Sequence, residues 1–158
     1  MRLVPNSFFM RIPEYDFAGE VVDANKNPGF EVGDQVFGMI PVGGTFKNGQ
    51  GALAHYAYVP VKITTHRPKE ISPNDASGIP VVAMTAYAAV YQIGRLEAGQ
   101  RIFINGGTTS VGIYAIQFAK GLGCKVYASA SGKNEQFLKS LGVDEVRVHR
   151  SNSRVRSH

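Results

Sequence analysis

The segment that most constrains the fold is Arg101-Ile-Phe-Ile-Asn-Gly-Gly-Thr-Thr-Ser-Val-Gly112. An apolar run ends in a glycine-bearing turn, and an apolar helical stretch begins directly after it. This succession is typical of a dinucleotide-binding unit, because the turn brings backbone N–H groups at the helix N-terminus close to a diphosphate. The glycine spacing is incomplete, since Thr109 stands where a glycine is usual between Gly106 and Gly112. We expect Thr109 to restrict the backbone without preventing binding, because threonine tolerates extended dihedral angles and adds a hydroxyl.

The segments around this turn alternate between strand and helix patterns. Such alternation predicts a parallel sheet with right-handed crossovers. The expected elements are a strand over residues 101–105, a helix over 110–122, a strand over 125–129, a helix over 133–141 and a strand over 144–148.

The first seventy residues carry a different pattern, with short apolar runs separated by glycine and proline. We expect strands over residues 17–22 and 52–61, and two short strand pieces within 30–37 around a Gly-Asp turn. Dense short strands of this kind favour a small barrel-like β domain.

The pattern changes at residue 72. Ser72 is a plausible N-cap, Pro73 suits the first helical position, and Asp75 completes the spacing of a capping box. Apolar helical segments follow through residues 79–93, interrupted by Pro80. We therefore expect a β domain over residues 1–71, a nucleotide-binding domain over 72–149 and a disordered basic tail over 150–158.

Composition excludes several classes of function. The formal net charge is +5, but four of the 17 basic residues are the arginines at positions 147, 150, 154 and 156, and the others nearly balance the 12 acidic residues. A basic tail is most often solvated, so we expect no nucleic-acid partner. No apolar run is long enough to span a membrane, and the N-terminus does not read as a signal peptide. The single cysteine, Cys124, permits no intrachain disulfide, and we expect a cytoplasmic location.

Six stretches together carry a resemblance to a known family. They are the turn above, Asp16-Phe-Ala-Gly-Glu-Val-Val22, Glu31-Val-Gly-Asp-Gln-Val-Phe-Gly38, Ala54-His-Tyr56, Ile79-Pro-Val-Val-Ala-Met-Thr-Ala-Tyr87 and Ser140-Leu-Gly-Val-Asp-Glu-Val146. In this order they resemble the medium-chain dehydrogenase/reductase superfamily, and they are most similar to its zinc-less quinone oxidoreductases and enoyl reductases. The resemblance implies an α/β fold, with a partial GroES-like β domain followed by the first half of a Rossmann-type doubly wound domain, three parallel strands with helices.

The resemblance also implies an activity and a cofactor. The activity is hydride transfer from NADPH to an α,β-unsaturated carbonyl compound or a quinone. NADPH is favoured over NADH because no acid follows the second strand before Glu135, whereas hydroxyls and Lys133 would hold a 2′-phosphate. The resemblance implies that Thr85 matches the family threonine that approaches the nicotinamide. The alternatives are an ordinary surface lysine at Lys133 and an ordinary helix-interior threonine at Thr85. The candidate cofactor-binding residues are Thr85, Gly106, Thr108, Thr109, Ser110, Val111, Gly112, Ser131 and Lys133. Ser129 is a further hydroxyl beside the last two that would hold a 2′-phosphate.

Two positions argue against a metal. Tyr15 stands where zinc-dependent members carry a ligand histidine, and Val81 stands where they carry a ligand cysteine. We therefore expect no metal site. Tyr15 is the candidate proton donor, with two alternatives: a packing role for its ring and a proton supplied by solvent.

The resemblance covers residues 13–146 and reaches only the third of about six expected strands of the doubly wound domain. Strand 101–105 would then lie at an unpaired edge, and the segment that forms the nicotinamide half would be missing. A truncated, catalytically inactive fragment is therefore the second interpretation, and nucleic-acid binding through the basic tail is the third. Full-length relatives are expected to form homodimers.

Overall fold

The computed structural model describes residues 12–41, 43 and 49–148, so the basic tail expected over 150–158 lies outside the described residues. The chain divides into two compact units, residues 1–81 and residues 82–158. Each unit is described by itself. Nowhere in the described ranges is a helix long and apolar enough to cross a bilayer.

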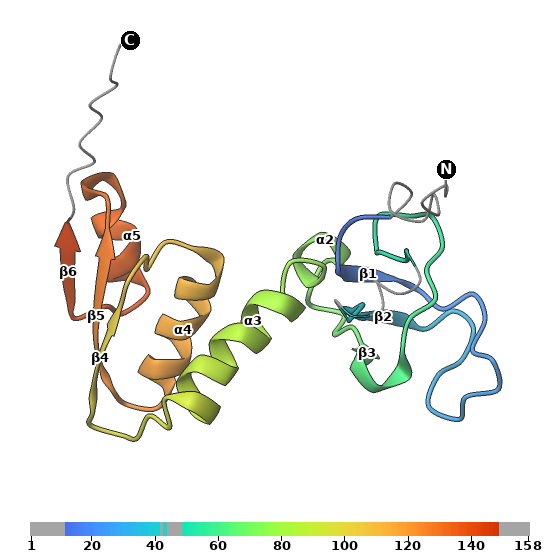
Figure 1. Cartoon of the computed structure of the whole chain (residues 1–158), viewed down its shortest axis with the longest axis horizontal. Helices are drawn as coiled ribbons and strands as arrows, with labels where there is room; N and C mark the ends of the chain where they lie inside the picture. The colour runs from blue at the N-terminus through green and yellow to red at the C-terminus, as the bar shows by residue number, and fades with distance from the viewer. Residues whose placement is uncertain (1–11, 42, 44–48, 149–158) are drawn as a thin grey trace, which may run out of the picture. The chain divides into compact units, whose positions relative to one another are not determined.

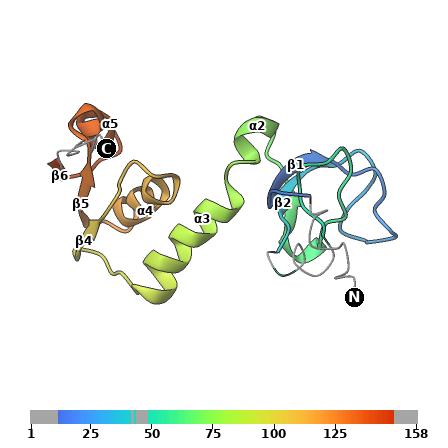
Figure 2. The same ribbon diagram turned by 45° about the horizontal axis from the view of Figure 1, so that its top comes forward.

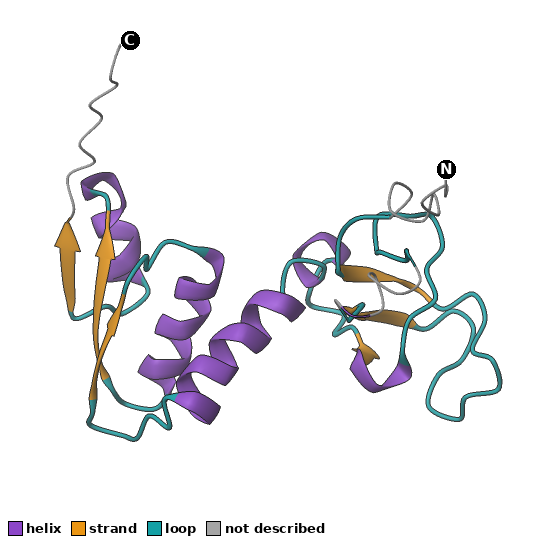
Figure 3. Cartoon of the chain, in the orientation of Figure 1, coloured by secondary structure: helices purple, strands orange, loops and turns teal. Residues whose placement is uncertain are grey.

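The first unit contains an antiparallel sheet in the order β1-β2-β3 (Figure 3). Its strands are β1 (Asp16–Glu20), β2 (Gln35–Met39) and β3 (Thr64–His66). Asp16 pairs with Met39, and Val36 pairs with His66. Val36 and Ile40, in and directly after the central strand, are buried.

In this unit the strand predicted over residues 52–61 is wrong, and of the two strand pieces predicted within 30–37 only the one after the Gly-Asp turn is confirmed, as the start of β2. The segment before β2 is a turn, because Gly33 has a positive φ of 98° and the Asp34 carboxylate accepts the backbone N–H of Glu31 at 2.8 Å. The strand that pairs with β2 in a hairpin is β1, not a piece of residues 30–34. Residues 52–60 form no strand, and residues 61–63 are the 3₁₀-helix η2 (Val61–Ile63). Alternation and aromatic residues favour a strand only where a neighbouring strand can pair with it. Residues 52–60 pair with none of the described strands.

The predicted helix start at residue 72 is confirmed. Helix α2 (Pro73–Ala76) has Ser72 as its N-cap and Pro73 in its first turn. The Ser72 hydroxyl accepts the backbone N–H of Asp75 at 3.1 Å and donates to the Asp75 carboxylate at 2.6 Å. Pro80 begins a helix rather than interrupting one, since α3 (Pro80–Tyr87) continues directly into the π-helix η3 (Ala88–Ile93).

The second unit contains the predicted parallel sheet, in the order β4-β5-β6. The strands are β4 (Arg101–Ile104), β5 (Lys125–Ala130) and β6 (Glu145–Val148). They are joined by α4 (Ser110–Gly121) and by η4 (Gly132–Asn134) with α5 (Glu135–Ser140). Both crossover helices, α4 and α5, lie on the same face of the sheet (Figures 1 and 2). Among the described strands β4 is an edge strand, as predicted, and Phe103 on it is 55% exposed.

The core of this unit lies between the sheet and its helices. Ile116 of α4, Val126 of β5 and Leu138 of α5 are fully buried and belong to one apolar cluster. The Asp144 carboxylate holds the entry to β6, because it accepts the backbone N–H of Val126 at 2.7 Å and the Lys120 ammonium at 3.0 Å. These contacts, the Val126 bond first, hold the pKa of Asp144 below its ordinary value. The second unit is thus a well-packed frame for the turn between β4 and α4.

Candidate functional site

The turn between β4 and α4 is capped by Thr109. Its backbone is extended, with φ −72° and ψ 155°, so it is the N-cap of α4. Its hydroxyl oxygen accepts the backbone N–H of Gly112 at 3.0 Å and its O–H donates to the carbonyl of Gly106 at 2.9 Å. Threonine is a favoured N-cap residue because its side-chain oxygen satisfies a first-turn N–H group. The residue that breaks the glycine pattern therefore closes the turn.

The two flanking glycines are required for different reasons. Gly106 has a φ of 76°, a conformation that side-chain-bearing residues rarely adopt. At Gly112 a Cβ atom would lie 2.4 Å from the carbonyl oxygen of Gly106 and 3.0 Å from the Thr109 hydroxyl. The start of α4 can approach the turn this closely only because residue 112 has no side chain.

The first turn of α4 presents unused hydrogen-bond donors. In the part of the chain that the structure describes, the backbone N–H groups of Ser110 and Val111 donate no hydrogen bond. Ser110 is exposed and Val111 is half-buried. The helix macrodipole adds partial positive charge at the same place. Such donors, together with the close approach at Gly112, form a surface that suits a phosphate group.

Ser129 has a structural role that the sequence did not predict. It is 7% exposed, near the end of β5. Its hydroxyl accepts the backbone N–H of Gly106 at 2.9 Å and donates to Oδ1 of Asn105 at 2.7 Å, and its carbonyl accepts the N–H of Gly107 at 2.9 Å. Both the donor and the acceptor functions of the hydroxyl are thus used within the protein. The interpretation of Ser129 as a phosphate ligand is therefore wrong, because its hydroxyl fastens the turn to β5.

Ser131 and Lys133 follow the end of β5. Because β4 and β5 are parallel, these residues lie at the same edge of the sheet as the glycine turn. Ser131 is the N-cap residue of η4, and its hydroxyl accepts a hydrogen bond from the side-chain amide of Asn134 at 3.2 Å. Lys133 is exposed. The structure therefore places Ser131 and Lys133 at the edge that carries residues 106–112.

The remaining candidates lie elsewhere. Thr85 is an exposed residue of α3 in the second unit, and Thr108 is half-buried in the turn itself. Tyr15 is half-buried directly before β1 in the first unit, where its carbonyl accepts the N–H of Ile40 at 2.8 Å. Within the second unit, the structure places the turn residues, Ser131 and Lys133 at the same edge of the sheet, whereas Tyr15 belongs to the first unit. Roles for Thr85 and Tyr15 stay predictions.

Asp16 is a charged residue outside the set of candidate site residues predicted from the sequence. Its carboxylate accepts the backbone N–H of Val81, at 3.0 Å to Oδ1 and 3.2 Å to Oδ2. Partial burial raises the pKa of this carboxyl above its ordinary value, the hydrogen bond from Val81 lowers it, and the nearby charge of Glu14 adds a smaller upward shift. The contact spans 65 residues of sequence and ties β1 to the start of α3.

Among the described residues, no three His, Cys, Asp or Glu side chains gather as metal ligands would.

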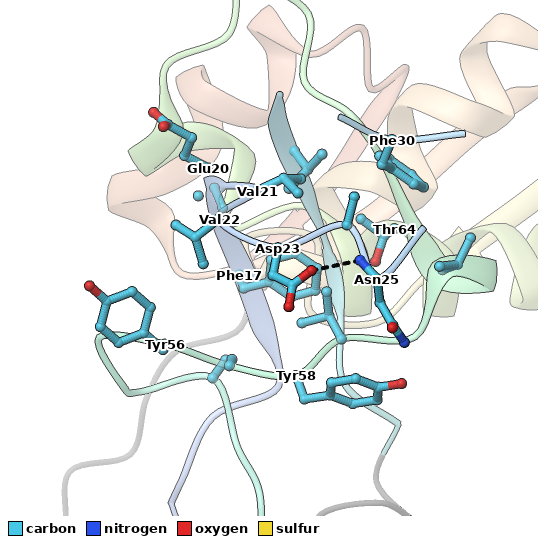
Figure 4. A pocket seen from close by; sticks show the side chains of 18 of the residues that line it. Phe17, Glu20, Val21, Val22, Asp23, Asn25, Phe30, Tyr56, Tyr58 and Thr64 are labelled. Atoms are coloured by element: carbon cyan, nitrogen blue, oxygen red, sulfur yellow. Dashed lines mark hydrogen bonds between the residues drawn. The ribbon is translucent and has the colours of Figure 1, made fainter. Parts of the chain in front are cut away.

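A separate hollow of about 540 Å³ lies in the first unit (Figure 4). Its walls come from β1, the loop after it and the segment around residues 54–59. Tyr56 and Tyr58, which line it, are 77% and 75% exposed. Beside it the backbone N–H of Asn25 donates to the Asp23 carboxylate at 2.8 Å. None of the predicted site residues lines this hollow.

The curated proteins to which the chain is similar include oxidoreductases and an enoyl reductase. The chain is 38% identical over 144 residues to the chloroplastic quinone-oxidoreductase QR1 of Triphysaria versicolor, an alignment that covers 87% of this chain and 42% of that protein. It is 35% identical over 136 residues to the mitochondrial NAD(P)H oxidoreductase RTN4IP1 of Danio rerio, covering 83% and 34%. It is 34% identical over 140 residues to the trans-enoyl reductase pgmF of Aspergillus terreus, covering 85% and 38%. The chain therefore spans less than half the length of these relatives. No protein-family model matches it.

The fold has a close counterpart among solved structures. The quinone oxidoreductase of Coxiella burnetii superposes with a TM-score of 0.77 at 27% sequence identity, over 89% of this chain and 44% of that one. The expected fold class is confirmed: an antiparallel sheet that corresponds to part of a GroES-like domain, followed by three parallel strands with helices that correspond to half of a Rossmann-type domain.

Proposed function

Because the chain belongs to the quinone oxidoreductase and enoyl reductase family over the segment that it shares with these relatives, we propose that it serves zinc-independent, NADPH-dependent reduction of quinones or α,β-unsaturated carbonyl compounds. The observation that carries the proposal is the turn between β4 and α4. Its unused N–H groups at Ser110 and Val111 and its close approach at Gly112 suit the diphosphate of a dinucleotide.

The cofactor preference rests on the edge of the sheet beside β5. No carboxylate occurs between Lys125 and Asn134 that would bind the 2′-hydroxyl of NADH and repel a 2′-phosphate. Ser131 supplies a hydroxyl there and the exposed Lys133 an ammonium, which together suit the extra phosphate of NADPH. In this proposal residues 72–149 are the nucleotide-binding domain.

The chemistry itself belongs to the cofactor. When bound, NADPH supplies a hydride that adds to the β-carbon of an enone while a proton adds to the neighbouring carbon, or that reduces a quinone together with one proton, leaving NADP⁺. The chain's own part is to hold the diphosphate at residues 106–112 and the 2′-phosphate at Ser131 and Lys133, with Thr85 beside the nicotinamide. Tyr15 is the candidate proton donor, and solvent is the alternative. Because tyrosine and valine occupy the positions of the zinc ligands His and Cys at residues 15 and 81, no metal takes part in this proposal.

A second candidate function remains beside the first. The chain covers 42% of the length of the quinone-oxidoreductase relative from Triphysaria versicolor. The second candidate function is nucleotide binding without reduction of a substrate. Nucleic-acid binding has no support, since residues 150–158 lie outside the described residues. Homodimer formation and a cytoplasmic location remain predictions, and two of the relatives are named as chloroplastic and mitochondrial.

The test is a titration of the purified chain with NADPH, and in parallel with NADH, followed by nicotinamide fluorescence. We expect saturable binding that favours NADPH, and Lys133→Ala should weaken NADPH binding about tenfold, the order expected for one charged contact to a phosphate. Binding of NADH should change little in this variant, because NADH lacks the 2′-phosphate.

Lys139→Ala is the matched control, because Lys139 is an exposed lysine of α5 and its removal changes the net charge equally. Equal weakening in both variants would contradict the assignment of Lys133. No binding of either nucleotide would refute the proposed function. Binding without reduction of enones or quinones would favour the second function.

A further inference from the structure

Asn105 lies between the end of β4 and Gly106, and it is exposed. Its side-chain oxygen Oδ1 accepts the Ser129 hydroxyl hydrogen at 2.7 Å. The same hydroxyl accepts the backbone N–H of Gly106 at 2.9 Å. A serine hydroxyl has a single hydrogen to donate, and this geometry commits it to Asn105. The amide oxygen of Asn105 is thereby held toward the buried end of β5.

Because Oδ1 of Asn105 faces the Ser129 hydroxyl, the amide nitrogen Nδ2 points away from that hydroxyl. Nδ2 of Asn105 carries two N–H groups, and neither donates to any group in the described residues. The backbone N–H groups of Ser110 and Val111 are likewise unused across the described ranges. Side-chain and backbone donors therefore flank one turn at the carboxyl end of β4, where doubly wound sheets bind their ligands.

We propose that Asn105 is a further nucleotide-binding residue, whose amide donates to a phosphate oxygen of the dinucleotide's diphosphate, and that Ser129 is the positioning residue that orients it. This inference rests on the proposed function and extends it to a side chain beyond the residues expected to bind the cofactor. The Ser129 hydroxyl does not touch the ligand; it acts through Asn105 and Gly106.

The test uses the full chain, NADPH and two substitutions of Asn105. Asn105→Asp keeps an oxygen that can accept the Ser129 hydroxyl, but it places a second, anionic oxygen where the amide donor was. We expect it to weaken NADPH binding by tenfold or more, on the order of a lost charged hydrogen bond. Asn105→Ala removes the donor without adding a charge, and we expect a loss of about threefold to tenfold.

Gln117→Glu is the matched control for Asn105→Asp. Gln117 is an exposed residue of α4 whose side chain bonds only to the carbonyl of Ile113 within its own helix, and the substitution changes the net charge by the same amount. We expect its NADPH affinity to stay within about twofold of that of the wild-type chain. The deficit of Asn105→Asp relative to wild type should shrink as NaCl is raised, because salt screens repulsion between two exposed anions. A purely structural loss would not follow salt in this way.

The outcomes separate the two hypotheses. If the wild-type chain binds NADPH and both Asn105 variants bind it equally well, Asn105 does not contact the nucleotide and this inference alone fails. It fails also if Gln117→Glu weakens binding as much as Asn105→Asp, because the effect would then reflect net charge. If the wild-type chain binds neither nucleotide, the proposed function fails and this inference with it. Should Asn105→Asp not fold, as judged by circular dichroism, the Asn105→Ala titration decides.

Discussion

Replacing Ser129 with alanine isolates the interaction that fastens the glycine turn to the sheet. The substitution removes one oxygen and retains the backbone, so the bond from the N–H of Gly107 to the carbonyl of residue 129 should persist. Two hydrogen bonds are lost, one from the N–H of Gly106 and one to Oδ1 of Asn105. Since alanine fills nearly the volume of serine, the variant tests hydrogen bonding rather than packing.

The two lost hydrogen bonds contribute unequally to the free energy of unfolding. Asn105 is exposed, so its oxygen can bond to water instead, and its contribution should be small. The hydrogen bond from Gly106 is partly buried, and a buried N–H group left without a partner costs about 1–3 kcal/mol. Partial access of water to Gly106 places the expected loss at the lower end, about 1–2 kcal/mol in the free energy of unfolding.

The measurement is urea unfolding followed by circular dichroism, without nucleotide, so that the result does not depend on the proposed function. Ser140→Ala is the control: Ser140 is exposed at the end of α5, and its hydroxyl donates to the carbonyl of Phe137 at 2.7 Å. An exposed substitution of this kind should change stability by less than about 0.5 kcal/mol. If Ser129→Ala is no more destabilising than Ser140→Ala, the turn does not depend on the Ser129 hydroxyl and the reasoning above is refuted.

Two further predictions concern the other tight contacts. Gly112→Ala should lower the free energy of unfolding by about 1–3 kcal/mol, because its Cβ would lie 2.4 Å from the backbone oxygen of Gly106; an unchanged thermal midpoint would contradict this close approach. Burial raises the folded-state pKa of Asp16 above its ordinary 3.8, so the folded chain binds the proton more tightly and loses stability as the pH rises from 3.8 through the folded-state value. Asp16→Asn, which keeps an oxygen for the N–H of Val81, should remove this part of the pH dependence in urea titrations between pH 4 and 7; an identical pH profile in both chains would contradict it.

The elements that the sequence predicts correctly are those determined by residues close together in the chain. The strand, turn and helix over residues 101–122 follow from an apolar run, glycine and a capping threonine, all within a short stretch. The start of α2 likewise follows from Ser72, Pro73 and Asp75, and the structure confirms it. The strand predicted over residues 52–61 is wrong because a strand depends on a partner, and no local pattern reports whether one is available.

The contacts that the sequence could not predict are long-range. Asp16 meets Val81 across 65 residues, and Ser129 meets Gly106 across 23. In the sequence, Ser129 and Ser131 are equivalent hydroxyls beside a lysine, and only the point at which β5 ends distinguishes them. Ser129 is buried at the end of the strand, whereas Ser131 lies beyond it and is half-buried. Assigning both serine hydroxyls near the end of β5 to the 2′-phosphate is therefore wrong for Ser129.

The substitution of threonine for the middle glycine illustrates why motif spacing alone is a weak guide. A glycine at position 109 would leave the backbone freer, whereas Thr109 satisfies the N–H of Gly112 and the carbonyl of Gly106 through one hydroxyl. The N–H groups of Ser110 and Val111 donate to no described residue, so the cap uses only the N–H group of Gly112. What a diphosphate requires of this segment is two available backbone donors and a close approach at residue 112. Thr109 is compatible with both conditions, because its hydroxyl bonds to Gly106 and Gly112 and not to the N–H groups of Ser110 and Val111.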